Sequence, residues 1–247
     1  MDIRKLVENI NLTSSGFPDR TLSEKGKVYT CLNPYSYHIF KKHSKEYERL
    51  DGIFVDGMLM CHLINRLWGY RIPRLSMDMS GMAPVLFSRL NDPASTETLY
   101  LIGARQQEVE DTVRQIREAY PNIHIAGVRN GYFKTPEERR KAIEEIVNKQ
   151  PDFTLIGMGS PLQETFAADL RDAGYKGIGF TCGGFLHQTS SNINYYPEWV
   201  NKYELRAFYR LYKERGLFGR LYNVLLQFPA LFTADTMKYK CGKKKCD

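Results

Sequence analysis

The chain has 247 residues, of which 43% are hydrophobic and 26% are charged. This composition supplies enough apolar material for one large domain, or for one domain with an appendage, and it excludes a disordered protein. No stretch approaches the roughly 18 apolar residues that a membrane-spanning helix needs, and the polar N-terminal residues lack the apolar run of a secretory signal. The five cysteines are scattered and odd in number, which fits reduced thiols better than a disulfide framework.

The positive charge is concentrated at the C-terminal end. From Val200 onward there are eleven Lys or Arg residues against four acidic residues, a net of +7 that equals the formal charge of the whole chain. The rest of the chain is therefore about neutral. A neutral body with a basic tail indicates an anionic partner for the tail, and it argues against a body that binds nucleic acid.

Hydrophobic runs and turn residues predict six strands that alternate with helices. Residues 1–26 are predicted to form a polar arm before the first strand. The predicted strands are 28–32, 52–55, 98–102, 122–128, 153–157 and 177–181. The predicted helices are 35–50, 58–68, 83–91, 106–120, 135–148 and 161–174. This alternation predicts a Rossmann-like α/β fold, with a mostly parallel sheet and helices on both faces.

The pattern changes after Gly184. Residues 196–214 and 217–232 are predicted helices in which aromatic residues and arginines interleave. We therefore predict an α/β domain over residues 1–195 and a C-terminal helical appendage with a Lys-rich tail over residues 196–247. A basic helix with aromatic residues suits an anionic membrane surface. It also suits a helix that packs on the core with a solvated basic face, and the sequence leaves both possibilities open.

The stretch Gly157-Met-Gly-Ser-Pro-Leu-Gln-Glu164 follows the fifth predicted strand. Glycines let a ligand approach the backbone, and the N–H groups at a helix start favour an anion such as a diphosphate. Ser160 is the predicted N-cap of the helix that follows. We predict that Gly157, Gly159 and Ser160 contact a ligand and that Gln163 lies at the mouth of a cleft. A tight turn with no ligand is the alternative.

Asp56 leaves the second predicted strand and precedes Gly57. Ligands of parallel α/β sheets bind at the carboxyl ends of the strands, where a carboxylate could act as a general base. Asp56 could instead cap the helix that begins at Met58, and the local pattern favours the cap. The chain has no Gly-x-Ser-x-Gly motif and no third glycine of a dinucleotide fingerprint. These absences argue against the hydrolases built on that motif and against a dinucleotide cofactor.

Seven motifs follow one another along residues 28 to 225. They are Leu32-Asn33-Pro34, Val55-Asp56-Gly57, Tyr120-Pro121, Asn130-Gly-Tyr-Phe133, Pro151-Asp152, the run from Gly157 to Glu164, and Tyr209-Arg210-Leu211. Together they resemble the WecG/TagA/CpsF glycosyltransferase family (glycosyltransferase family 26). The resemblance implies a bacterial enzyme that moves a sugar from a UDP-sugar onto a sugar carried on polyprenyl diphosphate, in the assembly of surface polysaccharide or teichoic acid. It also implies a cytoplasmic protein that associates peripherally with the inner face of the cell membrane through its C-terminal helices.

The resemblance also implies roles for individual residues. Asp56 is expected to be the general base and Gln163 a second catalytic residue; a single base implies inversion at the anomeric carbon. Arginines are expected to offset the charge of the departing diphosphate, so neither a metal nor a cofactor is expected. Cys31 stands where the family usually has Thr. The expected substrate-binding residues are Cys31, Asn33, Arg74, Gly103, Gly131, Tyr132, Gly157, Gly159, Ser160, Gly183, Gly184, Arg210 and Arg220.

The identity of the donor is open among UDP-N-acetylmannosamine, its uronic acid and UDP-glucose. Two other functions are alternatives: a Rossmann-type nucleotide-sugar-modifying enzyme and a non-enzymatic basic protein that binds anions. The first needs a bound dinucleotide, against which the missing third glycine argues. The acceptor sugar, the linkage and the oligomeric state do not follow from the sequence.

Overall fold

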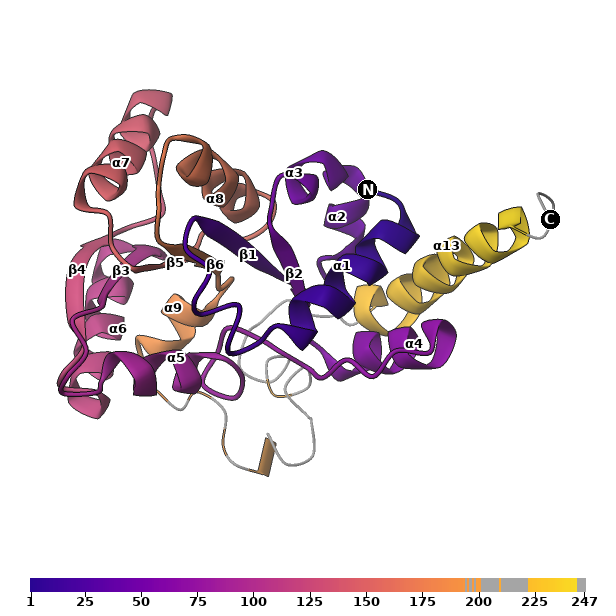
Figure 1. The fold of residues 1–247 in the computed structure, drawn as a ribbon, viewed down its shortest axis with the longest axis horizontal. Helices are drawn as coiled ribbons and strands as arrows, with labels where there is room; N and C mark the ends of the chain where they lie inside the picture. Colours follow the sequence, from indigo (N-terminus) through magenta and orange to yellow (C-terminus); the bar gives the residue numbers. More distant parts are fainter. Residues whose placement is uncertain (194, 196, 198, 201–208, 210–221, 244–247) are drawn as a thin grey trace.

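The computed structural model describes residues 1–193, 195, 197, 199–200, 209 and 222–243. At its centre lies a six-stranded sheet in the order β2-β1-β6-β5-β3-β4 (Figure 1). Each neighbouring pair of strands is parallel, so the predicted α/β fold is confirmed. The strands are β1 (Lys27–Leu32), β2 (Gly52–Val55), β3 (Thr98–Gly103), β4 (His124–Arg129), β5 (Phe153–Gly157) and β6 (Ile178–Thr181).

Helices pack on both faces of the sheet. Side chains alternate between the faces along a strand, so Tyr100 and Ile102 of β3 join the core cluster with α7 and α8. Leu99 and Leu101 join the opposite cluster with α5 and α6. The helices are α1 (Ile3–Ser15), α2 (Tyr37–Lys42), α3 (Ser44–Glu48), α4 (Met58–Trp68), α5 (Ala83–Leu90), α6 (Gln106–Ala119), α7 (Pro136–Lys149), α8 (Leu162–Asp172), α9 (Phe185–Thr189), the short π-helical segment η1 (Asn223–Gln227) and α13 (Phe228–Lys243).

The prediction that residues 1–26 form a polar arm is wrong. The segment contains helix α1, whose N-cap residue Asp2 accepts a hydrogen bond from the backbone N–H of Lys5 at 2.8 Å. The helix packs against β2, and Asn9 Oδ1 accepts the backbone N–H of Ile53 at 2.9 Å. The prediction failed because the apolar stripe of this helix is narrow in a polar sequence. The completely buried residues of that stripe are Leu6, Val7 and Ile10.

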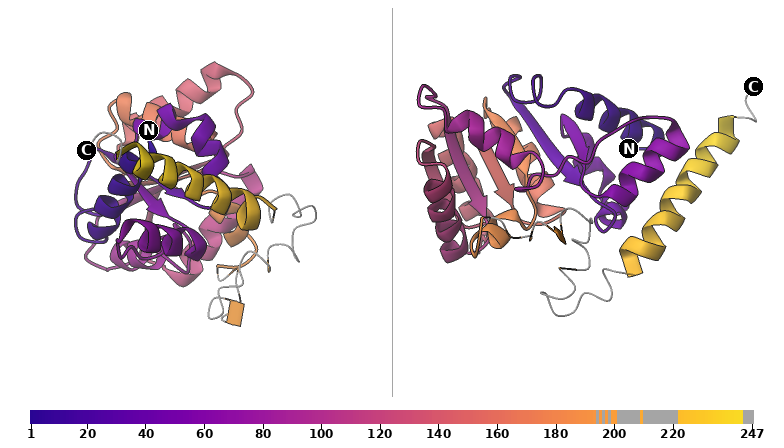
Figure 2. Two further views of the ribbon diagram at one scale, coloured as in Figure 1. Left: turned by 90° about the vertical axis from the view of Figure 1, so that its right-hand side faces the viewer. Right: turned by 90° about the horizontal axis from the view of Figure 1, so that it is seen from below.

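Helix α13 packs on the body at the β2 side of the molecule, at the opposite end from β4 (Figures 1 and 2). Phe228 and Phe232 are buried and contact the ring of Tyr37 edge-on. Asp235 accepts hydrogen bonds from the Tyr37 hydroxyl at 2.9 Å and from Lys41 Nζ at 2.7 Å. Helix α13 therefore packs on the core, which is one of the two arrangements that the sequence left open. Most of the chain between α9 and η1 lies outside the described residues, and the predicted boundary of the appendage stays a prediction.

Backbone packs directly on backbone where β3 and β5 end. A Cβ atom on Gly103 would lie 2.3 Å from the carbonyl oxygen of Gly157, and a Cβ atom on Gly131 would lie 2.9 Å from the Cα atom of Gly103. The N–H of Ala104 donates to the same Gly157 oxygen at 3.0 Å. Gly103, Gly131 and Gly157, three of the glycines predicted to contact a ligand, are thus needed for packing. A side chain at Gly103 or Gly131 would prevent these turns from meeting.

Truncating Ile10 to Ala tests the packing of α1. Ile10 is completely buried, so Ile10→Ala should lower the free energy of unfolding by about 2–5 kcal/mol. Leu12 lies on the same helix with 60% of its surface exposed, and Leu12→Ala should have little effect. Chemical denaturation measures both losses; equal losses would contradict the placement of α1 on β2.

Adding a methyl group to Gly103 tests the close approach of the strand ends. Gly103→Ala should lower the melting temperature strongly, because the new Cβ atom overlaps a carbonyl of β5 that is fixed in the sheet. Gly159 is the control: its φ is +75°, but among the described residues other than its chain neighbours no atom would lie within 4 Å of a Cβ there. Gly159→Ala therefore carries only the strain of a left-handed residue, about 1–2 kcal/mol. A smaller loss for Gly103→Ala than for Gly159→Ala would contradict this packing.

Candidate active site

Asp56 lies at the carboxyl end of β2 and forms an ion pair with an arginine. Arg74 donates two hydrogen bonds to Asp56 Oδ1, from Nε at 3.1 Å and from Nη2 at 2.9 Å. The side chain of Asp56 is 33% exposed, against 13% for Arg74. Both of these bonds go to Oδ1, and no described residue donates a hydrogen bond to Oδ2. Among the described residues, Arg74 thus engages one oxygen of the carboxylate and leaves the other without a donor.

Asp56 does not cap helix α4, so the local interpretation that favoured a cap is wrong. The N-cap residue is Gly57, with φ 134° and no side-chain hydrogen bond to the helix. The backbone N–H of Asp56 donates to the carbonyl of Leu32 at 2.9 Å, which continues the pairing of β1 with β2 by one residue. The carboxylate turns to Arg74 instead, a partner that lies 18 residues further along the chain.

Arg74 is held between two carboxylates. Its Nη2 atom also donates to Asp78 Oδ2 at 3.0 Å, and Asp78 Oδ1 accepts the backbone N–H of Ser80 at 2.8 Å. Burial acts to lower the pKa of Arg74, but the two carboxylates outweigh it and the pKa is raised. Arg74 is therefore a fixed cation that orients Asp56. Its charge is already paired, so this geometry gives no support to its expected role with the donor diphosphate.

Cys31 and Asn33, at the end of β1, both bond within the protein. Cys31 Sγ lies 3.8 Å from the carbonyl oxygen of Leu75. Burial, together with the negative charge of Asp56, raises the pKa of this thiol, so it stays neutral. Asn33 Oδ1 accepts the backbone N–H of Ser36 at 2.8 Å, which orders the turn from β1 to α2. Cys31 thus lies close to Asp56, and Asn33 shapes the neighbouring turn.

Gln163 lies in the wall of the site and not at its mouth, where the sequence placed it. Only 3% of the residue is exposed. Its Nε2 atom donates to Glu164 Oε1 at 3.0 Å, and its Oε1 atom accepts the backbone N–H of Gly183 at 3.1 Å. The amide thereby ties the turn after β5 to the turn after β6. Its catalytic role stays a prediction.

The turn after β5 presents backbone, and its serine points inward. Ser160 is not the N-cap, because Pro161 occupies that position, and Ser160 Oγ donates to Glu164 Oε1 at 3.0 Å. Gly159 has φ +75° and Gly183 has φ +54°, and a Cβ built on either has no atom of the described residues within 4 Å, apart from those of its chain neighbours. These two of the predicted glycines therefore border open space, where a ligand can approach the main chain. Gly184 follows as the residue before α9.

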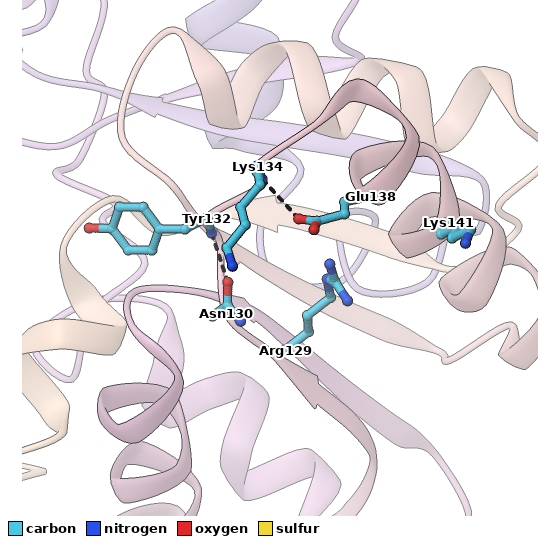
Figure 3. Close-up of a pocket in the computed structure, with 6 residues that line it drawn as sticks. All are labelled: Arg129, Asn130, Tyr132, Lys134, Glu138 and Lys141. Atoms are coloured by element: carbon cyan, nitrogen blue, oxygen red, sulfur yellow. Dashed lines mark hydrogen bonds between the residues drawn. The ribbon is translucent and has the colours of Figure 1, made fainter.

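A positively charged pocket of about 470 Å³ lies where β4 meets the start of α7. Tyr132, which the sequence predicted to bind substrate, projects from this region with 67% of its surface exposed, and its backbone N–H donates to Asn130 Oδ1 at 3.0 Å (Figure 3). The walls carry three cations and one carboxylate, which favours an anionic ligand. They are formed by Arg129, Asn130, Tyr132, Lys134, Glu138 and Lys141.

The order of the strands places these features along one edge of the sheet. Strands β1 and β6 separate β2 from β5, so Asp56 and the β5 turn are three strand spacings apart, about 14 Å. The pocket at β4 is five spacings from Asp56, about 24 Å. Asp56 and the open glycine turns therefore flank one region above β1 and β6, and the basic pocket lies beyond it.

Arg210 and Arg220, the two other predicted cations, lie outside the described residues. Within the part of the chain that the structure describes, no group of three or more His, Cys, Asp or Glu side chains is arranged to hold a metal ion.

Sequence reasoning missed the polar network beneath the site. Glu164 is completely buried, and its Oε1 atom accepts hydrogen bonds from Thr30, Ser160 and Gln163. In the sequence, Glu164 was noted only as the last residue of the motif that begins at Gly157. The available signal was its spacing of three and four residues from the apolar Ala167 and Ala168, which are buried on the same helix.

Comparison with known proteins agrees with this arrangement. The profile of the "Glycosyl transferase WecG/TagA/CpsF family" matches residues 11–242. A Shigella boydii protein named UDP-Gal:alpha-D-GlcNAc-diphosphoundecaprenol beta-1,4-galactosyltransferase is 34% identical over 236 residues, which are 96% of this chain and 92% of that protein.

Two relatives named N-acetylglucosaminyldiphosphoundecaprenol N-acetyl-beta-D-mannosaminyltransferase match over shorter stretches. The one from Bacillus subtilis (strain 168) is 32% identical over 113 residues, 46% of this chain and 43% of that protein. The one from Bacillus spizizenii (strain ATCC 23059 / NRRL B-14472 / W23) is 26% identical over 141 residues, 56% of this chain and 54% of that protein. The family that the ordered motifs indicated is thereby confirmed: the chain belongs to the WecG/TagA/CpsF family and is a glycosyltransferase.

Proposed function

We propose that the enzyme transfers a sugar from a UDP-sugar to a sugar carried on polyprenyl diphosphate, in the assembly of a bacterial surface polysaccharide or teichoic acid. The observation that carries the proposal is the placement of Asp56, a partly exposed carboxylate at the carboxyl end of β2 with one oxygen engaged by Arg74. The names of the relatives support the substrates: all three act on a sugar-diphosphoundecaprenol, and one takes its sugar from UDP-Gal.

In this scheme Asp56 Oδ2 removes the proton from the acceptor hydroxyl as the hydroxyl oxygen attacks the anomeric carbon of the donor. The bond from that carbon to the diphosphate of UDP breaks, and UDP leaves with the bonding electron pair. Attack from the face opposite the leaving group inverts the anomeric centre. Arg74 fixes the direction of the carboxylate, since both of its bonds go to Oδ1.

We assign the binding site of the donor to the turns at Gly159 and Gly183 and to the part of the site that lies toward β4. The open backbone at Gly159 and Gly183 and the N-terminus of α8 favour the diphosphate. From that position the uracil ring would extend toward β4, where the exposed ring of Tyr132 offers a stacking surface.

Membrane contact is proposed for the segment just before α13. Tyr222, Leu225 and Leu226 are large apolar residues with 59%, 47% and 63% of their surfaces exposed. No helix within the described part of the chain has the length and apolarity to traverse a bilayer. An exposed apolar segment in the most basic part of the chain would place the enzyme at the inner face of the membrane, where a lipid-linked acceptor is reached.

Replacing Asp56 with Asn tests the base. Asp56→Asn should keep the fold and donor binding but lower the transfer rate by two to four orders of magnitude, the usual contribution of a general base. Asp78→Asn is the matched control, because Asp78 accepts a hydrogen bond from the same Arg74 but is not the proposed base, and its loss should be much smaller. Transfer to a short polyprenyl-diphosphate sugar is the assay, and a near wild-type rate for Asp56→Asn would remove Asp56 from the mechanism.

Replacing Tyr132 tests the donor orientation. Tyr132→Ala should raise the KM for the UDP-sugar by about fivefold to 150-fold, since stacking of a base on an aromatic ring contributes about 1–3 kcal/mol. Tyr132→Phe keeps the ring and should retain the wild-type KM. Steady-state kinetics with varied donor distinguish the two variants; an unchanged KM in Tyr132→Ala would place the uracil elsewhere.

The exposed apolar segment can be tested without unfolding α13. The triple variant Tyr222→Ser, Leu225→Ser, Leu226→Ser should reduce cosedimentation with anionic vesicles, because it removes apolar area that would enter the lipid interface. Val85→Ser is the control, since Val85 is also exposed, at 41%, but lies on α5. Unchanged vesicle binding by the triple variant would exclude this segment as the membrane contact.

A further inference from the structure

A buried carboxyl connects three of the strands whose ends form the site. Glu164 is completely buried, and its Oε1 atom accepts hydrogen bonds from Thr30 Oγ1 at 2.9 Å, Ser160 Oγ at 3.0 Å and Gln163 Nε2 at 3.0 Å. Thr30 Oγ1 is also 2.6 Å from Thr181 Oγ1. Thr30 belongs to β1 and Thr181 to β6, while Ser160 lies in the turn after β5. One carboxyl oxygen therefore fixes the relative positions of these three strand ends.

The second oxygen of Glu164 has no such partners. Oε2 is buried and accepts no hydrogen bond from any described residue. A negative charge on it would be uncompensated in an apolar interior, which is costly. Burial accordingly raises the pKa of Glu164, against the opposing hydrogen bonds from Gln163, Thr30 and Ser160. The titratable side chain packed nearby is Tyr47 of α3, whose own pKa is raised by burial and further by Glu164.

The hydrogen bond to Gln163 leads from this carboxyl to the surface of the site. Gln163 Nε2 is held by Glu164, so its Oε1 is directed to the backbone N–H of Gly183. Gly183 is one of the two turn glycines that border open space. Ser160, the next partner of Glu164, directly follows the other one, Gly159. A change at Glu164 is therefore transmitted to both turns to which the donor diphosphate is assigned.

We propose that Glu164 is a positioning residue for sugar transfer: its carboxyl, which never touches substrate, holds the Gly159 and Gly183 turns in the arrangement that receives the donor diphosphate. The proposal rests on the glycosyl transfer proposed above. It differs from a general stabilising role because it predicts a loss in the rate of the reaction itself, at temperatures where the variant protein is still folded.

The test compares Glu164→Ala and Glu164→Gln with Thr154→Val. Thr154 is also completely buried and donates a hydrogen bond to the Tyr175 hydroxyl at 2.9 Å, but that bond lies away from the site. Steady-state kinetics are measured at least 15 °C below the melting temperature of each variant, about four to seven times the shift that 1 kcal/mol causes in a protein of this size. Wild-type protein and Asp56→Asn are run in parallel.

We expect Glu164→Ala to lower kcat by tenfold or more while the KM for the acceptor changes less. Glu164→Gln keeps an oxygen for the same three donors and should restore most of kcat. Thr154→Val should lose stability without losing kcat. If Glu164→Ala does not fold, Thr30→Val serves in its place, because it removes one donor to Glu164 and the contact with Thr181; a smaller fall in kcat is then expected.

Stability against pH gives an independent readout. A carboxyl whose pKa is raised in the folded protein stabilises the fold fully below its unfolded pKa of about 4.3, and this stability is lost as the pH rises through the folded pKa. The melting temperature of wild-type protein should therefore fall relative to that of Glu164→Gln as the pH rises above that unfolded pKa.

Two outcomes would overturn the proposal. The first is a kcat for Glu164→Ala, or for Thr30→Val in its place, equal to that of Thr154→Val. The second is a Glu164→Gln variant that is as slow as Glu164→Ala. A wild-type protein that transfers no sugar would instead refute the proposed function itself, so the two failures are distinguishable.

Discussion

The ion pair between Asp56 and Arg74 is the interaction on which the proposed chemistry of the enzyme depends. It fixes a carboxylate at the edge of a parallel sheet while one of its oxygens stays available, with Arg74 Nη2 2.9 Å from Oδ1. A base needs a defined direction as well as a suitable position, because proton transfer requires hydrogen-bond geometry to the substrate. Arg74 Nη2 also donates to Asp78 Oδ2 at 3.0 Å, and this second bond holds the guanidinium in place beside Asp56. The pair therefore suits the orientation of a base better than the neutralisation of a departing diphosphate.

The remainder of the site is built from backbone and buried polar groups. Glycines bring the ends of β3 and β5 together, and two further glycines leave main chain open to solvent. The side chains that order these turns, Gln163 and Glu164, are themselves buried. Such an arrangement is preorganised: its hydrogen bonds are made before any ligand arrives, so binding requires little rearrangement. A donor bound here would meet N–H groups whose positions are already fixed.

The fold could be predicted from the sequence because each strand is a short apolar run bounded by turn residues. Buried parallel strands such as β5, which is buried throughout, produce this signal directly. The N-terminal helix could not be predicted in the same way, since only one narrow face of α1 is apolar. Its place in the fold depends on β2, which comes much later in the chain, and on the bond between Asn9 and Ile53.

The candidate site was predictable in its composition but not in its contacts. Strand ends and a family resemblance indicated Asp56, Gln163 and the glycines. The partners of those residues are remote in sequence: Arg74 is 18 residues from Asp56, and Thr30 is 134 residues from Glu164. Local patterns therefore assigned Asp56 to a cap and Gln163 to the cleft mouth, whereas long-range pairing put the first in an ion pair and the second in the wall.

The most direct test of the central claim is a crystal structure of the enzyme with UDP and a short lipid-diphosphate sugar acceptor bound together. We predict that the attacking hydroxyl lies within hydrogen-bond reach of Asp56 Oδ2, about 2.6–3.2 Å, with Oδ1 still bonded to Arg74. An acceptor hydroxyl bound to a different side chain, with Asp56 remote from it, would contradict the role of Asp56 as the base.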